Sequence, residues 1–304
     1  MGVAYVLLGV ALIALTLRDI FATLFHPLGH GHVGRGVIAA VSWSGHRLSG
    51  RLPAATVLIG PIAYIAVIAC WATLLVVGWA LIFFPFMPEG FNYDQGLVPS
   101  EHAGFDDALY VSLVDLTSLG FGDISPRASL LRMLGPVETM FGLGLLTASI
   151  SWLVSIYGAI SRRDAFAHEV HLCREAEEQL GEKLADADPA LLERLLTSFA
   201  EQLIATRRDL IHFPIAYHFR SEDERRALST LLPFLVGLCE EASEAGRPQA
   251  LRVRAEMLRM AIDDFAATLR SRLAVPGETT ETTLDHYDAH QRHRRPEGPA
   301  APGA

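Results

Sequence analysis

The sequence DDALYVSLVDLTSLGFGD, from Asp106 to Asp123, decides how this chain is interpreted. Its first part, residues 106–117, carries apolar side chains at Leu109, Val111, Leu113, Val114 and Leu116. A helix that crosses a bilayer needs about 20 predominantly apolar residues, so this part is too short to span. The pattern instead predicts a re-entrant half-helix, which enters the membrane and ends inside it.

Two glycines, Gly120 and Gly122, follow this half-helix. A loop inside a membrane must satisfy its backbone polar groups, and it can do so by lining a cavity with carbonyl oxygens that replace the water around an ion. Successive carbonyls reach one axis only if alternate residues adopt φ > 0, which glycine does without a Cβ clash. The half-helix would then direct the negative end of its dipole toward a cation.

Residues 118–123, Ser-Leu-Gly-Phe-Gly-Asp, resemble the pore signature of potassium channels, Thr-Val-Gly-Tyr-Gly-Asp, in which one pore loop lies between an outer and an inner helix. Ser118 takes the place of the threonine and keeps a hydroxyl for the innermost ion site. Phe121 takes the place of the tyrosine and lacks its phenol. The resemblance covers roughly residues 54–163. It implies a selectivity filter formed by Thr117, Ser118, Leu119, Gly120, Phe121, Gly122 and Asp123, with K⁺ bound at Ser118, Leu119, Gly120 and Phe121.

The composition favours a membrane protein and excludes several other classes. Hydrophobic residues make up 51% of the chain, charged residues 19%, and the mean hydropathy is +0.29. A net charge of −9 argues against nucleic acid as a partner. Cys70, Cys173 and Cys239 are too few and too scattered for a disulfide framework or a zinc site. We expect no cofactor and no enzymatic activity, because no nucleophile, base and orienting group occur together.

Three segments are predicted to span the membrane: an uncleaved first helix over Val3–Phe25, an outer helix over Ala54–Phe84 and an inner helix over Leu130–Tyr157. Within the first, Asp19 can pair with a neighbouring helix or lie near the interface. Residues 26–52 are a polar connection whose amphipathic middle, Val37–Trp43, is expected on the membrane surface. Its histidines, at positions 26, 30 and 32, are interpreted as solvated loop residues.

The charges flanking these spans predict the orientation of the protein in the cell membrane. Arg35, Arg47 and Arg51 precede the outer helix, and Arg162 and Arg163 follow the inner helix. By the positive-inside rule both flanks are cytoplasmic, so the filter mouth faces the outside. An acidic segment between the outer helix and the half-helix is then an extracellular turret; it carries Glu89, Asp94, Glu101, Asp106 and Asp107.

The inner helix contains candidates for gating and for the pore wall. Gly142 lies 20 residues after Gly122, as the gating-hinge glycine does in the family that the filter resembles, and Gly144 is a second candidate. Polar residues at i, i+4 and i+8 share one face of this helix, either as pore lining or for close helix packing. They are Thr147, Ser151 and Ser155.

Two acidic residues, Asp115 in the half-helix and Glu138 in the inner helix, should not face lipid. They can hydrogen-bond behind the filter, where a carboxylate supports its backbone and makes it sensitive to pH, or each can face water or a polar neighbour.

After Arg163 the pattern indicates a soluble helical bundle of four helices. Asp188-Pro189 predicts the start of one helix, and Ser221 with Glu224 predicts a capping box for another. From Val275 onward we expect a disordered tail. The expected segments are 1–52 for the first helix and connection, 53–163 for the pore domain, 164–274 for the cytoplasmic bundle and 275–304 for the tail.

The sequence therefore predicts an all-α membrane protein that forms a potassium-selective homotetramer, one pore loop being supplied by each chain. Its partners are potassium ions and the lipid bilayer, with a cytoplasmic protein as a further candidate partner of the bundle. Two alternatives stay open. One is a non-selective cation channel, favoured by the altered filter, and the other is a non-conducting membrane scaffold.

Overall fold

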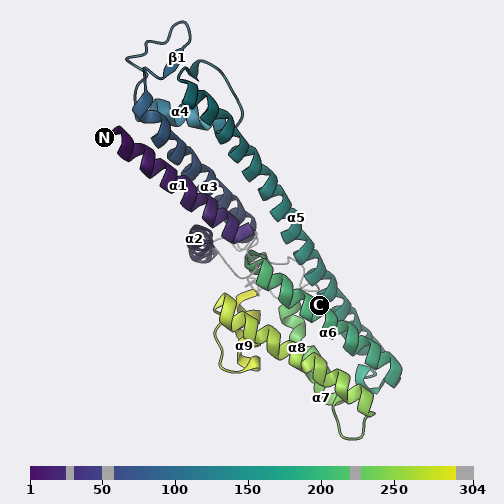
Figure 1. Ribbon diagram of the computed structural model, residues 1–304. Helices are drawn as coiled ribbons and strands as arrows, with labels where there is room; N and C mark the ends of the chain where they lie inside the picture. Colours follow the sequence, from purple (N-terminus) through teal and green to yellow (C-terminus); the bar gives the residue numbers. More distant parts are fainter. Residues whose placement is uncertain (25–30, 50–57, 220–226, 292–304) are drawn as a thin grey trace, which may run out of the picture. The chain divides into compact units, whose positions relative to one another are not determined.

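The computed structural model describes residues 1–24, 31–49, 58–219 and 227–291, and its order of elements is drawn in Figure 1. The chain divides into two compact units, one of residues 1–40 with 63–154 and the other of residues 41–62 with 155–304. The expected boundaries after residues 52 and 163 do not coincide with these units. The N-terminal helix belongs to the same unit as the pore segment rather than to a segment of its own.

Among the described residues, three helices are long and apolar enough to cross a membrane. They are α1 (Gly2–Leu24), α3 (Ile59–Phe83, extended by a 3₁₀ turn to Phe86) and α5 (Ser129–Leu180). The shorter α4 (Phe105–Leu116) lies between α3 and α5 in the chain. The protein is thus an all-α membrane protein, as the sequence predicts. Residues 54–57, expected to begin the outer helix, lie outside the described residues.

Helix α1 packs against α3 through glycines. A Cβ placed on Gly9 would lie 2.5 Å from the carbonyl oxygen of Gly78, and one on Gly78 would lie 2.7 Å from the side chain of Ile13. Small residues let two helix backbones approach in this way, which is the usual basis of helix association inside a bilayer. The contact explains why α1 belongs to the unit that contains the pore segment.

Helix α2 (His32–Ser49) is longer than the amphipathic stretch expected from the sequence. Its N-terminus is capped from another helix, because the buried Asp19 accepts hydrogen bonds from the backbone N–H groups of Val33 at 3.0 Å and Gly34 at 3.3 Å. Trp71 of α3 donates a third, at 2.9 Å. Asp19 therefore pairs with neighbouring helices, one of the two environments expected for it. Of the three histidines expected in a solvated loop, His32 is the exposed first residue of α2, and His26 and His30 lie outside the described residues.

A short antiparallel pair of strands, β1 (Phe91–Tyr93) and β2 (Ile124–Pro126), was missed from the sequence. In its register Phe91 faces Pro126 and Tyr93 faces Ile124. Strands of three residues are too short to show an alternating pattern. The pair nevertheless joins the segment between α3 and α4 to the residues that precede α5.

Helix α5 continues to Leu180 without interruption, beyond the end expected at Tyr157. Its later part belongs to the second unit, where both arginines have partners. Arg162 forms an ion pair with Asp209 at 2.8 Å, and Arg163 donates hydrogen bonds to the carbonyl oxygens of Ala216 and Phe219. These contacts lie within the helix at the position where the sequence predicts a boundary between two domains.

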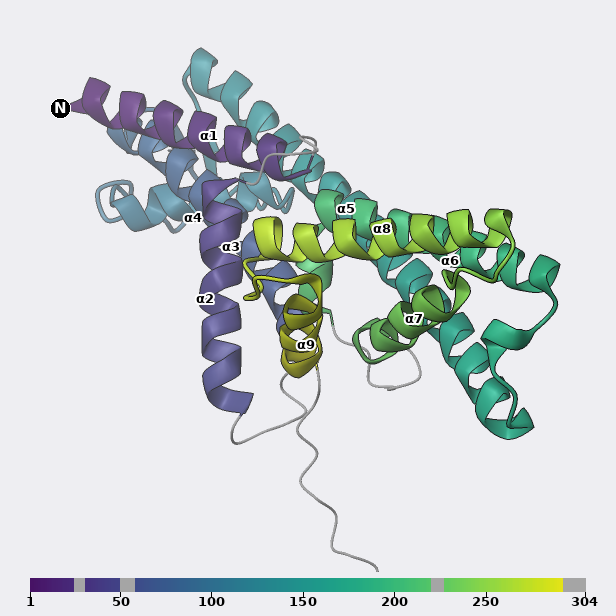
Figure 2. The same cartoon turned by 90° about the horizontal axis from the view of Figure 1, so that it is seen from below.

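The second unit is a helical bundle in which the end of α5 packs with α6 (Pro189–His212), α7 (Leu228–Ala242) and α8 (Gln249–Leu273) around one apolar core. Helices α6 and α8 lie side by side (Figure 2). Asp188 caps α6 by accepting from the N–H groups of Ala190 and Leu191, so the predicted start of this helix is confirmed. The capping box predicted at Ser221 and Glu224 lies outside the described residues.

The expectation of a disordered tail is wrong for its first part. Helix α9 (Thr280–Gln291) packs on the bundle and buries Leu284 and Tyr287, which are 4% and 3% exposed. The local composition is polar, so the sequence alone gave no sign of it. Two large side chains three residues apart fall on one helix face, and burying that face stabilises the helix. Residues 292–304 lie outside the described part of the chain.

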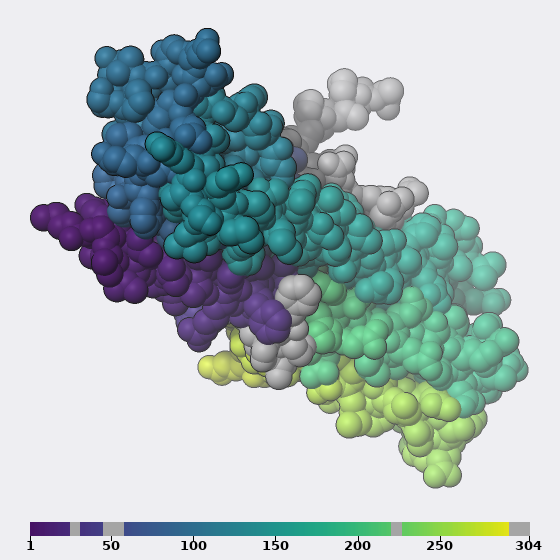
Figure 3. Space-filling view, turned by 45° about the horizontal axis from the view of Figure 1, so that its top comes forward, coloured from purple at the N-terminus to yellow at the C-terminus, as the bar shows by residue number. Residues whose placement is uncertain are grey.

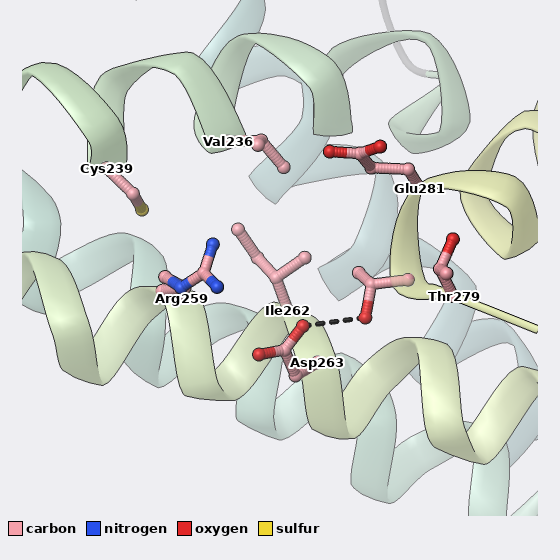
Figure 4. Close-up of a pocket in the computed structure, with 8 residues that line it drawn as sticks. Val236, Cys239, Arg259, Ile262, Asp263, Thr279 and Glu281 are labelled. Carbon is pink, nitrogen blue, oxygen red and sulfur yellow. Dashed lines mark hydrogen bonds between the residues drawn. The ribbon is translucent and has the colours of Figure 1, made fainter.

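A cavity of about 310 Å³ lies between α7, α8 and the start of α9, and Figure 4 shows its lining. Thr280 donates a hydrogen bond of 2.6 Å to Asp263 across it, and Cys239 lies at its wall. Burial raises the pKa of the Cys239 thiol to about 12. The thiol is therefore neutral at physiological pH.

We expect Leu284→Ala to lower the free energy of unfolding of the bundle by about 2–5 kcal/mol, because it leaves a cavity in a closed core. The exposed Asp285→Ala should change it by less than about 0.5 kcal/mol. Urea denaturation of the full-length protein followed by circular dichroism compares the two variants. Equal stabilities would mean that α9 does not pack on the bundle.

Candidate pore loop

The half-helix α4 is fixed at its N-terminus by acidic residues of its first turn. Asp107 accepts a hydrogen bond from the backbone N–H of Gly104 at 3.0 Å, and the His102 ring lies 3.0 Å from its other oxygen. Negative charge at Asp106 and Asp107 also interacts favourably with the positive end of the helix dipole. The 12-residue helix thus begins at a defined point and ends where the filter residues start.

The first filter residues are bonded back to the end of α4. The N–H groups of Thr117, Ser118 and Leu119 donate to the carbonyl oxygens of residues 113, 115 and 114 at 3.0–3.1 Å. The Thr117 hydroxyl adds a bond of 2.6 Å to the Leu113 carbonyl. These bonds occupy carbonyls that a helix C-terminus otherwise leaves unpaired, and they hold the start of the loop against the helix.

Every second residue of the loop has a positive φ: 61° at Ser118, 58° at Gly120 and 78° at Gly122. This is the alternation that turning successive carbonyls to one side requires. The sequence predicted it at the two glycines and missed it at Ser118. A left-handed serine costs roughly 1–2 kcal/mol, so its surroundings must hold it in place.

The loop is open to solvent in the single chain. Residues 117–122 are all exposed, with Leu119 at 59% and Phe121 at 65%. Among the described residues, none donates a hydrogen bond to the carbonyl oxygens of residues 118–122. Backbone carbonyls left free in this way are available to a ligand.

The far end of the loop is tied to α4 by a phenol from a different position. Tyr110, in the middle of α4, donates a hydrogen bond of 2.6 Å to Asp123. The Asp123 carbonyl accepts from the N–H of Asp94 at 2.8 Å, next to the strand pair β1–β2. Both ends of the loop are therefore anchored.

The two acidic residues of this region lie where α4 meets α5. Glu138 is fully buried, and its carboxyl group is 2.5 Å from the Ser112 hydroxyl of α4. Thr139 of α5 donates a bond of 2.8 Å to the backbone carbonyl of Asp115. The Glu138 carboxyl group therefore faces a polar neighbour, which is one of the environments expected for it.

The two candidate hinge glycines have different surroundings. A Cβ on Gly142 would overlap the carbonyl oxygen of Leu116, so α5 packs directly against the end of α4 at this point. A Cβ on Gly144 would meet nothing within 4 Å. Close packing therefore explains the glycine at position 142 without a hinge, whereas no contact accounts for Gly144.

The residues expected to line the pore are exposed in the single chain, on the same part of α5. Thr147, Ser151 and Ser155 are all exposed, and Thr147 bonds to the Leu143 carbonyl of its own helix. Large apolar side chains are exposed around them, and Figure 3 shows the teal residues of α5 at the open surface. These apolar residues are Met140, Leu143, Leu146, Ile150 and Val154. Both pore lining and helix packing remain compatible with this surface.

Residues 69–158 match the family model described as "Ion channel". This stretch contains most of α3, all of α4, the loop and the first part of α5, which is the part of the chain for which the sequence predicts a pore domain. The whole chain is also similar to an uncharacterized membrane protein, YdjJ, of Bacillus subtilis (strain 168), at 25% identity over 91% of this chain and 82% of the relative. No solved structure matches the chain.

Replacing each candidate hinge glycine by alanine separates packing from hinge motion. Gly142→Ala should lower the thermal stability of the purified protein, because its Cβ forces α4 and α5 apart. Gly144→Ala should leave it unchanged or raise it, since alanine favours a helix by up to about 1 kcal/mol over glycine. Thermal unfolding in detergent provides the comparison. An unfolding temperature for Gly142→Ala at or above that of Gly144→Ala would contradict the close contact with Leu116.

Proposed function

We propose that the protein is a potassium-selective ion channel in which four copies of the chain surround one pore. The observation that carries the proposal is the alternation of positive φ at Ser118, Gly120 and Gly122 in a loop that matches an ion-channel family. Carbonyls of Ser118 to Phe121, with the Ser118 hydroxyl, would replace the hydration shell of K⁺.

The assembly follows from the number of oxygen ligands that an ion needs. One loop presents carbonyls from one side only, so several copies must contribute before an ion is enclosed. The exposed filter and the apolar face of α5 around Leu146 and Ile150 supply surface for such copies. A closed ring with fourfold symmetry leaves none of this surface unpaired.

The side chains of the filter favour a weaker selectivity than the common signature. Leu119 and Phe121 change how firmly the backbone is held, while Gly120 and Gly122 keep the backbone itself. The bond from Tyr110 to Asp123 supports the loop in place of the missing tyrosine. A non-selective cation channel remains the alternative for a filter of this kind.

The orientation proposed for the channel places the filter mouth outside the cell and the helical bundle in the cytoplasm. The arginines at positions 35, 47, 51, 162 and 163 support it through the positive-inside rule. A non-conducting scaffold that binds a cytoplasmic partner through the bundle is disfavoured, because such a protein has no need of a left-handed residue at every second loop position.

Reversal potentials in opposed K⁺ and Na⁺ gradients, measured on the purified protein in planar bilayers, test selectivity. We expect a preference for K⁺ in the unmodified protein and its loss in Gly122→Ala, whose Cβ disfavours φ of 78°. Gly96→Ala is the matched control, because Gly96 also has a positive φ, 103°, with open space around it, but lies in the turret. Equal permeability of the two ions in the unmodified protein would favour the non-selective channel.

Native mass spectrometry of the protein released from detergent tests the assembly. We expect a tetramer, because four pore loops are needed to complete an ion site. Tetramer should also persist in Gly122→Ala, since that change alters the loop and not the apolar face of α5. A monomer or dimer as the sole species would contradict the proposal.

A further inference from the structure

We infer that Glu138 is a neutral carboxylic acid that donates its proton to Ser112, in a hydrogen-bonded chain that positions the half-helix α4 and, through it, the filter. The inference rests on the proposed channel function for its consequence, but not for its chemistry. Glu138 is then a positioning residue of the pore, and its proton forms the hydrogen bond that links α5 to α4 and, through Ser112, to α3.

The three groups that these hydrogen bonds connect come from three helices. Glu138 belongs to α5, Ser112 to α4, and the third group is the backbone carbonyl of Val76 in α3. The Ser112 Oγ lies 2.5 Å from Glu138 Oε1 and 3.0 Å from the Val76 oxygen. Both side chains have no exposed surface. Bulk water therefore does not reach either of them.

A count of hydrogens assigns the proton. A serine hydroxyl has one hydrogen, and it stands within hydrogen-bond distance of two oxygens here. The Val76 carbonyl can only accept, so the serine must donate to it for that bond to exist. The short contact to Glu138 is then a hydrogen bond only if the carboxyl group donates. The two bonds are then Glu138 O–H to Ser112 Oγ and Ser112 O–H to Val76 O, so each bond uses one hydrogen, and the Ser112 oxygen both accepts and donates.

Among the described residues, no cation pairs with the Glu138 carboxyl group, and its hydrogen-bonding neighbour is the Ser112 hydroxyl, whose single hydrogen the Val76 carbonyl already takes. The second oxygen of Glu138, Oε2, is buried and has no hydrogen-bond partner among the described residues. Within the described part of the chain, the ionisable group that acts on it is Asp115 of α4, also an acid. Asp115 lies against α5, where a Cβ on Gly135 would be 3.1 Å from its Oδ2. A buried charge without a cation or donors is strongly unfavourable, and a second acid nearby adds repulsion.

The chain of bonds bears on the filter because Ser112 lies one turn before the end of α4. The loop that begins at Thr117 is bonded to the carbonyls of that last turn. A displacement of α4 away from α3 or α5 therefore moves the start of the filter. Loss of the Glu138 proton removes the donor and places a charge at the contact, so the filter is expected to lose its support as the pH rises.

Infrared spectroscopy of the full-length protein tests the protonation state without any measurement of conduction. At pH 7 the spectrum of Glu138→Gln should lack a carbonyl band of a protonated carboxylic acid that the unmodified protein shows, so the band should appear in the difference spectrum of the two. The control Glu101→Gln, at an exposed turret position, should lose carboxylate bands only. Loss of carboxylate bands in Glu138→Gln as well would overturn the inference, whether or not the protein conducts. In the unmodified protein alone, a band of a protonated acid at pH 7 is expected, and its absence overturns the inference without any variant.

Potassium flux into liposomes as a function of pH tests the positioning role. The amide of Glu138→Gln can donate to Ser112 at any pH, so its flux should stay within about twofold of the unmodified protein at pH 7 and persist in alkaline solution, where that of the unmodified protein falls. Glu138→Ala and Ser112→Ala should each lower the flux at pH 7 by about fivefold or more. Parallel alkaline loss in the unmodified protein and Glu138→Gln would overturn the positioning role. Absence of flux from every form, with the acid band present, would reject the proposed channel function and leave the assignment of the proton intact.

Discussion

The alternation of backbone handedness over residues 118–122 is the constraint on which the rest of the pore unit depends. Such a backbone cannot form the regular hydrogen bonds of a helix or a sheet, and a left-handed serine within it is unfavourable by itself. It persists only because both of its ends are fixed. The end of α4 binds the first residues through their N–H groups, and the bond from Tyr110 to Asp123 together with the strand pair fixes the last. The loop is rigid to the extent that α4 is rigid.

Helix α4 is too short to be stable alone, and its position comes from the helices around it. Gly142 lets α5 touch the carbonyl at the end of α4, Thr139 bonds to the Asp115 carbonyl, and the Glu138–Ser112 contact adds α3 to the cluster. Each of these contacts is polar or involves a glycine. Inside a bilayer this is expected, because apolar burial does not distinguish one helix from lipid, whereas close approach and hydrogen bonds do.

Helix α1 is held by the same kind of contact, whereas the second unit is held together by its apolar core. Helix α1 is held on α3 by the Gly9–Gly78 contact, and through Asp19 it caps α2. In the bundle, by contrast, large apolar side chains dominate, and α9 joins it through Leu284 and Tyr287. Burying apolar surface stabilises such a core even when a polar helix contributes only two large side chains.

The sequence by itself determined the membrane class, the three spans, the half-helix and the two glycines of the loop, because length, hydropathy and glycine placement are local properties. It also predicted the cap of α6 at Asp188. Only the tertiary structure decided what depends on partners distant in the chain. Asp19 caps α2 through Val33, 14 residues later, Tyr110 bonds to Asp123, and Gly142 allows a contact with Leu116. Helix α9 could not be predicted from the sequence either, because it is stabilised by packing two side chains into a core that other helices form.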